Sequence, residues 1–133
     1  MKKLALLGAT LLLLLALAEP AGASQQRGFA FGRAGGNIQP YTVSIGSDGR
    51  VHASGPVTVG RMKLTASQLA TLELAVSAAR FASLHAVTDC HGTLPDIAAT
   101  FIRVGARTVR VHGACVARYT RLFTAFSRAV QLA

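Results

Sequence analysis

Acidic residues are scarce in this sequence. Five Asp and Glu stand against 14 Lys and Arg, which gives a formal net charge of +9, and tryptophan is absent. A glycosidase needs two carboxylates that flank one bond. Only Asp89 and Asp96 share a predicted loop, and nothing else in the sequence indicates a sugar site. The scarcity of carboxylates therefore argues against a glycosidase.

Motifs for nucleophilic catalysis and phosphate binding are also missing. No Gly-x-Ser-x-Gly nucleophile elbow occurs, and Gly35-Gly36 is not followed by the Gly-Lys-Ser/Thr of a P-loop. Cys90 is next to His91 in the sequence, but a cysteine nucleophile needs a free thiolate, and Cys115 offers a disulfide partner. We therefore expect a protein that is not an enzyme and that holds no cofactor.

Residues 1–23 have the pattern of a cleavable signal peptide. Lys2 and Lys3 form a short basic segment, residues 4–18 are almost wholly apolar, and Ala21-Gly22-Ala23 supplies the small residues that signal peptidases read. The apolar run of about 15 residues is shorter than the ~20 that a membrane-spanning helix needs, which favours cleavage over an uncleaved anchor. We expect cleavage after Ala23 and a secreted or periplasmic product with no transmembrane span.

The mature chain, residues 24–133, has the size of one domain. Because Lys2, Lys3 and Glu19 leave with the leader, the net charge changes from +9 to +8. A basic exported domain attracts anionic partners, such as an acidic protein or an envelope polymer. Specific nucleic-acid binding is not expected, since the Phe and Tyr residues fall mostly at core positions rather than among exposed basic residues.

The only two cysteines, Cys90 and Cys115, both belong to the mature chain. An even number of cysteines in a small exported domain predicts a disulfide. The alternative is a zinc site, because His85, His91 and His112 lie in the same part of the sequence and His112-x-x-Cys115 has ligand-like spacing. Adjacent Cys90 and His91 point in different directions and an oxidising compartment favours the disulfide, so we expect no bound metal.

Alternation of apolar and polar residues with a period of two predicts several strands. The clearest hairpin joins residues 40–46 to residues 50–54 through a Ser47-Asp48-Gly49 turn, with Val51 and Ala53 on the inner face. A second hairpin turns at Gly105-Ala106. Residues 87–96 read as a loop. The expected strands are residues 29–32, 40–46, 50–54, 57–59, 97–104 and 107–112.

Two helices are predicted between and after these strands. Thr65-Ala66-Ser67-Gln68 is a capping box that begins a helix ending near Ala79 or Arg80. A closing helix spans residues 116–131. The apolar stripes consist of Leu69, Leu72, Val76 and Ala79 in the first helix and Tyr119, Leu122, Phe123, Phe126 and Val130 in the second. This order predicts an α+β fold: an antiparallel sheet of about four to six strands with two helices packed on one face.

Two features are candidate binding sites. The first is a pair of loops whose candidate residues are Gly35, Gly36 and Asn37 in one and Asp89, His91, Pro95 and Asp96 in the other. The predicted disulfide at Cys90 would brace the second loop. The second feature is a stripe of arginines on the closing helix, Arg118, Arg121 and Arg128, for which the alternative is an ordinary solvated face.

Several short segments resemble the emfourin family of small protease inhibitors, which act on thermolysin-like metalloproteases, and secreted bacterial domains of the same layout. The segments are Arg33-Ala34-Gly35-Gly36, Leu64-Thr65-Ala66, Ala79-Arg80-Phe81-Ala82-Ser83-Leu84, Leu94-Pro95-Asp96 and Arg107-Thr108-Val109-Arg110-Val111. The resemblance covers roughly residues 31–130. The chain departs from the family in carrying a leader and a cysteine pair, and no inhibitory residue is transferred to it.

The sequence therefore predicts an exported, non-enzymatic domain that binds a macromolecule. The resemblance implies a secreted or periplasmic protease as the partner, with inhibition by a rigid loop that fills the active-site cleft. The alternative is an anionic component of the cell envelope, bound through the arginine stripe.

Overall fold

The computed structural model describes residues 27–133, so the signal peptide expected at residues 1–23 lies outside the described residues. Six strands and two α-helices make up the described chain. In chain order the elements are β1 (Phe29–Ala34), β2 (Tyr41–Ile45), β3 (Val51–Ser54), α1 (Ala66–Ala78), the 3-10 turn η1 (Phe81–Ser83), β4 (Val87–Asp89), β5 (Ala99–Val104), β6 (Arg107–His112) and α2 (Ala117–Val130).

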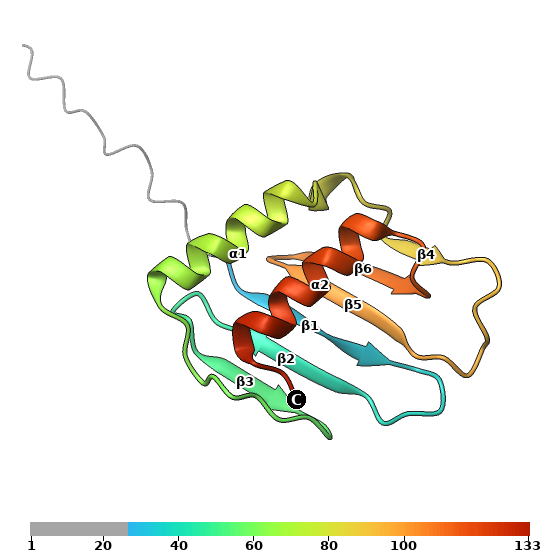
Figure 1. The fold of residues 1–133 in the computed structure, drawn as a ribbon, viewed down its shortest axis with the longest axis horizontal. Helices are drawn as coiled ribbons and strands as arrows, with labels where there is room; N and C mark the ends of the chain where they lie inside the picture. The colour runs from blue at the N-terminus through green and yellow to red at the C-terminus, as the bar shows by residue number, and fades with distance from the viewer. Residues whose placement is uncertain (1–26) are drawn as a thin grey trace, which may run out of the picture.

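All six strands form one sheet in the order β3-β2-β1-β5-β6-β4. Neighbouring strands are antiparallel except β4, which runs parallel to β6. Both helices lie against the same face of the sheet (Figure 1). The predicted α+β architecture is confirmed, and the parallel edge strand is an addition to it.

The core fills the space between the sheet and α2. Alternate residues of β1 bring Phe29 and Phe31 to the helix-covered face, where both are buried. Phe126 of α2 is fully buried between them, with ring centroids 5.2 Å from Phe29 and 5.6 Å from Phe31. Such offset aromatic contacts add specific geometry to the apolar burial. They fix α2 over the central strand of the sheet.

Local sequence signals position both helices as predicted. The Thr65 hydroxyl accepts a hydrogen bond from the Gln68 N–H at 3.2 Å, and the Gln68 side chain accepts one from the Thr65 N–H at 2.8 Å, which is the capping box. Every residue of the predicted α1 stripe is buried. In α2, Phe123 is partly buried and the other residues of the stripe are fully buried.

Three details of the expected strands are wrong. Val87–Asp89 is strand β4 and not part of a loop, because it pairs with β6 at Val87–Arg110 and Asp89–His112. Residues 57–59 form no strand beyond a single bridge between Val59 and Leu132, since this segment meets the end of α2 instead of the sheet. Ala53 is exposed, because only Val51 of β3 reaches the core.

Tyr119 should make stability fall at high pH. Burial raises the pKa of Tyr119 to about 12, and also raises the pKa of Tyr41. Between pH ~10, where an unfolded tyrosine ionises, and pH ~12 the unfolded state loses the proton that the folded state retains. The contribution of the two tyrosines to the free energy of unfolding is therefore expected to be constant below pH ~10 and to decline above it. Spectrophotometric titration of the two tyrosines tests this, and ionisation of both near pH ~10 in folded protein would contradict it.

Within residues 27–133 neither helix has the length and apolar character needed to cross a bilayer.

Candidate functional site

The two predicted binding loops lie side by side at one end of the sheet. The β1–β2 loop follows β1, and the β4–β5 loop precedes β5. Because β1 and β5 are antiparallel neighbours, paired from Phe29–Val104 to Ala34–Ala99, the two loops lie at the same end of the sheet. Their backbones are joined by a hydrogen bond from the Asn37 N–H to the Asp96 carbonyl, at 3.1 Å. Figure 1 shows both loops extending beyond the same end of the sheet. We call this region the loop end, residues 35–39 together with residues 91–98.

Gly36 makes the close approach of the two loops possible. Its φ is +64°, in the left-handed region, which glycine adopts without steric cost. A Cβ at this position would lie 2.4 Å from the Asp96 carbonyl oxygen and 2.7 Å from the Ala98 nitrogen. Gly35 also has a positive φ, +77°, but a Cβ there would meet only the Arg110 side chain at 3.7 Å. Gly36 is therefore required by packing between loops, and Gly35 by local conformation alone.

Three aliphatic side chains are exposed on the loop end. The exposed fractions are 42% for Ile38, 63% for Leu94 and 49% for Ile97. Ile38 and Ile97 line one groove together with Arg33 and Asp96. A hydrogen bond from the Ile97 N–H to the Leu94 carbonyl closes the turn that holds Leu94 and Ile97. Exposed aliphatic residues clustered within polar surroundings are typical of protein-binding surfaces.

The base of the longer loop is held on both sides. Cys90 and Cys115 form a disulfide, as predicted, which ties the residue after β4 to the segment before α2. His112, the last residue of β6, contacts both ends of the loop: its Nε2 lies 2.8 Å from the Ile97 carbonyl oxygen, and its Nδ1 lies 3.3 Å from an Asp89 carboxylate oxygen. These contacts leave the loop little freedom to change its conformation on binding.

The structure brings together most of the predicted loop residues. Asn37 and Asp96 are bonded directly, Gly35, Gly36 and Pro95 flank them, and His91 is exposed in the turn after Cys90. Asp89 instead belongs to strand β4 and faces His112, so it supports the loop from beneath. Sequence reasoning missed Ile38, Leu94 and Ile97. The signal that could have found them is the presence of large aliphatic residues within loops of otherwise polar and turn-forming residues.

Alanine substitution at the two glycines should separate the roles that the structure gives them. Gly35→Ala forces alanine into a left-handed conformation and should cost about 1 kcal/mol of unfolding free energy. Gly36→Ala adds a clash with the Asp96–Ala98 backbone, so a loss of about 2–3 kcal/mol is expected. Chemical denaturation of both variants measures the difference. Equal losses would show that the loops are not in contact as described.

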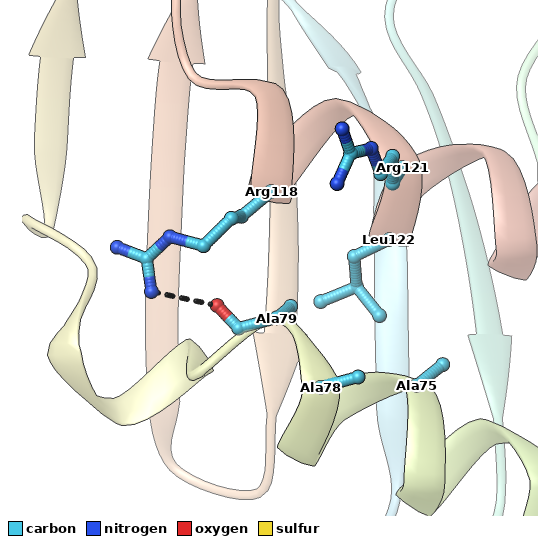
Figure 2. Close-up of a pocket in the computed structure, with 6 residues that line it drawn as sticks. All are labelled: Ala75, Ala78, Ala79, Arg118, Arg121 and Leu122. Atoms are coloured by element: carbon cyan, nitrogen blue, oxygen red, sulfur yellow. Dashed lines mark hydrogen bonds between the residues drawn. The ribbon is translucent and has the colours of Figure 1, made fainter.

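The three arginines of the predicted stripe on α2 have different surroundings in the structure. Arg118 donates hydrogen bonds to the Ala79 carbonyl at 3.1 Å and to the Ser83 hydroxyl at 3.3 Å, so it fixes the end of α1. Figure 2 shows the hydrogen bond from Arg118 to the Ala79 carbonyl. It also shows Arg121 and Leu122 of α2 opposite Ala75, Ala78 and Ala79, which line the same groove between the helices. With partners from residues 27–133, Arg121 and Arg128 form no side-chain hydrogen bond or ion pair. They line a second groove along the outer face of α2.

The two sulfurs considered as zinc ligands or as a nucleophile are joined to each other. Since Cys90 and Cys115 form the disulfide, neither offers a thiolate to a metal or to a substrate. In the part of the chain that the structure describes, no group of three or more His, Cys, Asp and Glu side chains is placed to hold a metal ion. The geometry of these residues is that of a brace for the loop end.

Comparison with protein-family models, curated proteins and solved structures gives no significant match to this chain. The loop end and the arginines of α2 must therefore be interpreted from their own geometry.

Proposed function

We propose that this protein is an exported, non-enzymatic domain that binds another protein through the loop end, and that its partner is a secreted thermolysin-like metalloprotease. The observation that carries the proposal is the hydrogen bond from Asn37 to Asp96. It makes one surface of two loops that are far apart in the sequence. Export of the domain rests on the leader pattern of residues 1–23 and agrees with the use of a disulfide.

The loop end has the properties that a steric inhibitor needs. It projects beyond the sheet, it carries three exposed aliphatic side chains, and it is fixed by the disulfide, by His112 and by Gly36. A rigid loop loses little conformational entropy on binding, so more of its contact energy contributes to affinity. A protease cleft is concave and accepts such a projecting loop. The resemblance to emfourins in sequence favours a thermolysin-like enzyme.

Titration of purified thermolysin-like proteases with the mature protein tests this proposal. The turnover of a peptide substrate should fall linearly with added protein and reach its minimum at one inhibitor per enzyme. The domain should stay uncleaved in the complex. Full turnover across a panel of such proteases, with folded domain in excess, would refute the assignment of the partner.

A second function is favoured by a separate observation: the guanidinium groups of Arg121 and Arg128 lie along one groove of α2 and have no partner within residues 27–133. We propose that they bind an anionic polymer of the cell envelope if the loop end is not the binding surface. Retention on an anionic column should then weaken with salt, because screening shortens the reach of exposed charges. Arg121→Glu with Arg128→Glu should abolish retention. The matched control is Arg103→Glu with Arg110→Glu, which makes the same change in net charge at exposed residues on the sheet face that the helices do not cover. An equal loss of retention in both double variants would show that net charge alone determines retention.

A further inference from the structure

A cleft lined by three arginines lies at the end of the sheet opposite the loop end. It opens between the end of α1, the turn η1 and the β5–β6 turn. Its floor is apolar and consists of Val76, Phe81 and Val104, all of them buried core residues. We call it the arginine cleft; its three arginines are Arg27, Arg80 and Arg107.

The cleft carries uncompensated positive charge. Arg27 is paired with Glu73 at 2.9 Å, which neutralises it. Arg107 donates to the Leu84 carbonyl, a neutral acceptor that holds the guanidinium in place and leaves its charge unbalanced. The Arg80 side chain has no hydrogen bond or ion pair within residues 27–133. Among residues 27–133, the guanidinium charges of Arg80 and Arg107 therefore have no acidic partner, and both side chains line the cleft together with its apolar floor.

Arg80 occupies a backbone position that does not suit arginine. It follows the last residues of α1 with φ +48°, in the left-handed region. Helices usually place glycine or asparagine there, because a Cβ is strained in this conformation. Within residues 27–133 the fold uses only the backbone of this residue: its N–H donates to the Ser77 carbonyl, and its carbonyl accepts from the N–H and the hydroxyl of Ser83. Strain kept at a residue whose side chain does nothing for the fold is a feature of functional sites.

We propose that the arginine cleft binds an amphiphilic anion, a carboxylate or phosphate headgroup carried on an alkyl chain. A guanidinium group matches both headgroups with paired N–H donors, so Arg80 and Arg107 would hold the head. The alkyl chain would lie along the apolar part of the lining, which is Ala82 with the exposed edges of Phe81 and Val104. A bare inorganic anion would leave the apolar floor uncovered, and an uncharged alkyl chain would leave both charges unpaired. The ligand therefore needs both parts.

Calorimetric titration of the folded mature protein with decyl phosphate, decanol and inorganic phosphate tests the inference. Decyl phosphate should bind at one site, at least about tenfold more tightly than either of the other two. Vesicles of phosphatidylglycerol form a separate arm. Binding to vesicles and to decyl phosphate indicates a lipid headgroup as the source of the ligand, and binding to decyl phosphate alone indicates a free amphiphile. Equal affinity for decyl phosphate and inorganic phosphate, or no binding of decyl phosphate, would overturn the proposal.

Variants at Arg80 separate binding from stability. Arg80→Gln and Arg80→Gly should each weaken decyl phosphate binding about tenfold, because each removes one charged hydrogen-bonding group from the headgroup. Arg80→Gly should also raise the midpoint of thermal unfolding by a few degrees over Arg80→Gln, since glycine relieves the strained backbone. Arg103→Gln is the matched control: it removes an exposed arginine from the opposite sheet face and should bind as the unchanged protein does. Unchanged binding in both Arg80 variants would contradict the assignment.

Discussion

Replacing Cys90 and Cys115 together by alanine is expected to lower the free energy of unfolding by about 3.5 kcal/mol. The disulfide joins residues 25 apart in the sequence, and closing a loop of this length in the unfolded chain removes that much conformational freedom in the chain-entropy model. A small domain has a total stability of only about 5–15 kcal/mol. Losing the bond should therefore shift the denaturation midpoint strongly.

The same substitution should affect one edge of the molecule more than the rest. Strand β4 has three residues and pairs only with β6 among the described strands, so the disulfide from the next residue, Cys90, to the segment before α2 adds a cross-link at its end. Amide exchange in residues 87–98 should accelerate in the double variant, while exchange in β1 and β5 follows the global stability. Urea denaturation measures the total loss, with reduced wild-type protein as the control. A loss below about 1 kcal/mol, or a difference between the reduced protein and the variant, would count against this account.

Replacing Leu94 and Ile97 together by aspartate should weaken the complex with a thermolysin-like protease at least about 100-fold. Both side chains are about half exposed or more and project from the loop end, so the fold tolerates the change. Contacts at the centre of an interface commonly contribute ~2 kcal/mol or more each, and about 2.7 kcal/mol corresponds to a factor of 100. A carboxylate buried without a partner in the active-site cleft of the protease would further weaken binding.

A matched variant controls for the added charge. Met62 and Leu74 are exposed to 63% and 71%, similar to Leu94, and lie outside the loop end. Met62→Asp with Leu74→Asp adds the same two charges to exposed apolar positions and should leave inhibition unchanged. Stability of both variants is checked by thermal unfolding. Equal weakening by the two double variants would mean that net charge, and not the loop end, determines the affinity.

Local signals predicted most of the fold, and the strand that they missed, β4, was missed for a clear physical reason. The capping box, the apolar stripes of both helices and the alternation in β2, β5 and β6 are properties of neighbouring residues. Strand β4 is too short to alternate and contains exposed Val87, and its parallel pairing with β6 depends on tertiary structure. Between β4 and β6 the chain forms β5, which pairs with the other edge of β6. A short edge strand of this kind has no periodic signal in sequence.

The candidate site was predictable in its parts but not in its assembly. Turn-forming residues marked both loops, and the expectation of export from the leader pattern predicted the disulfide that braces one of them. The contact between Asn37 and Asp96 follows from the pairing of β1 with β5, strands that are far apart in sequence. The arginine stripe shows the opposite case. Arg118, which the helical period groups with Arg121, instead donates a hydrogen bond to the Ala79 carbonyl at the end of α1. This contact depends on how the two helices pack, which the sequence period of one helix does not predict.

The most direct test of a single loop-end surface is amide hydrogen exchange on the mature domain, alone and with a thermolysin-like protease bound. We expect added protection in residues 35–38 and 91–97 together, with α2 and the arginine cleft unchanged. Protection of only one of the two loops, or protection over α2 with both loops still exchanging freely, would contradict the account.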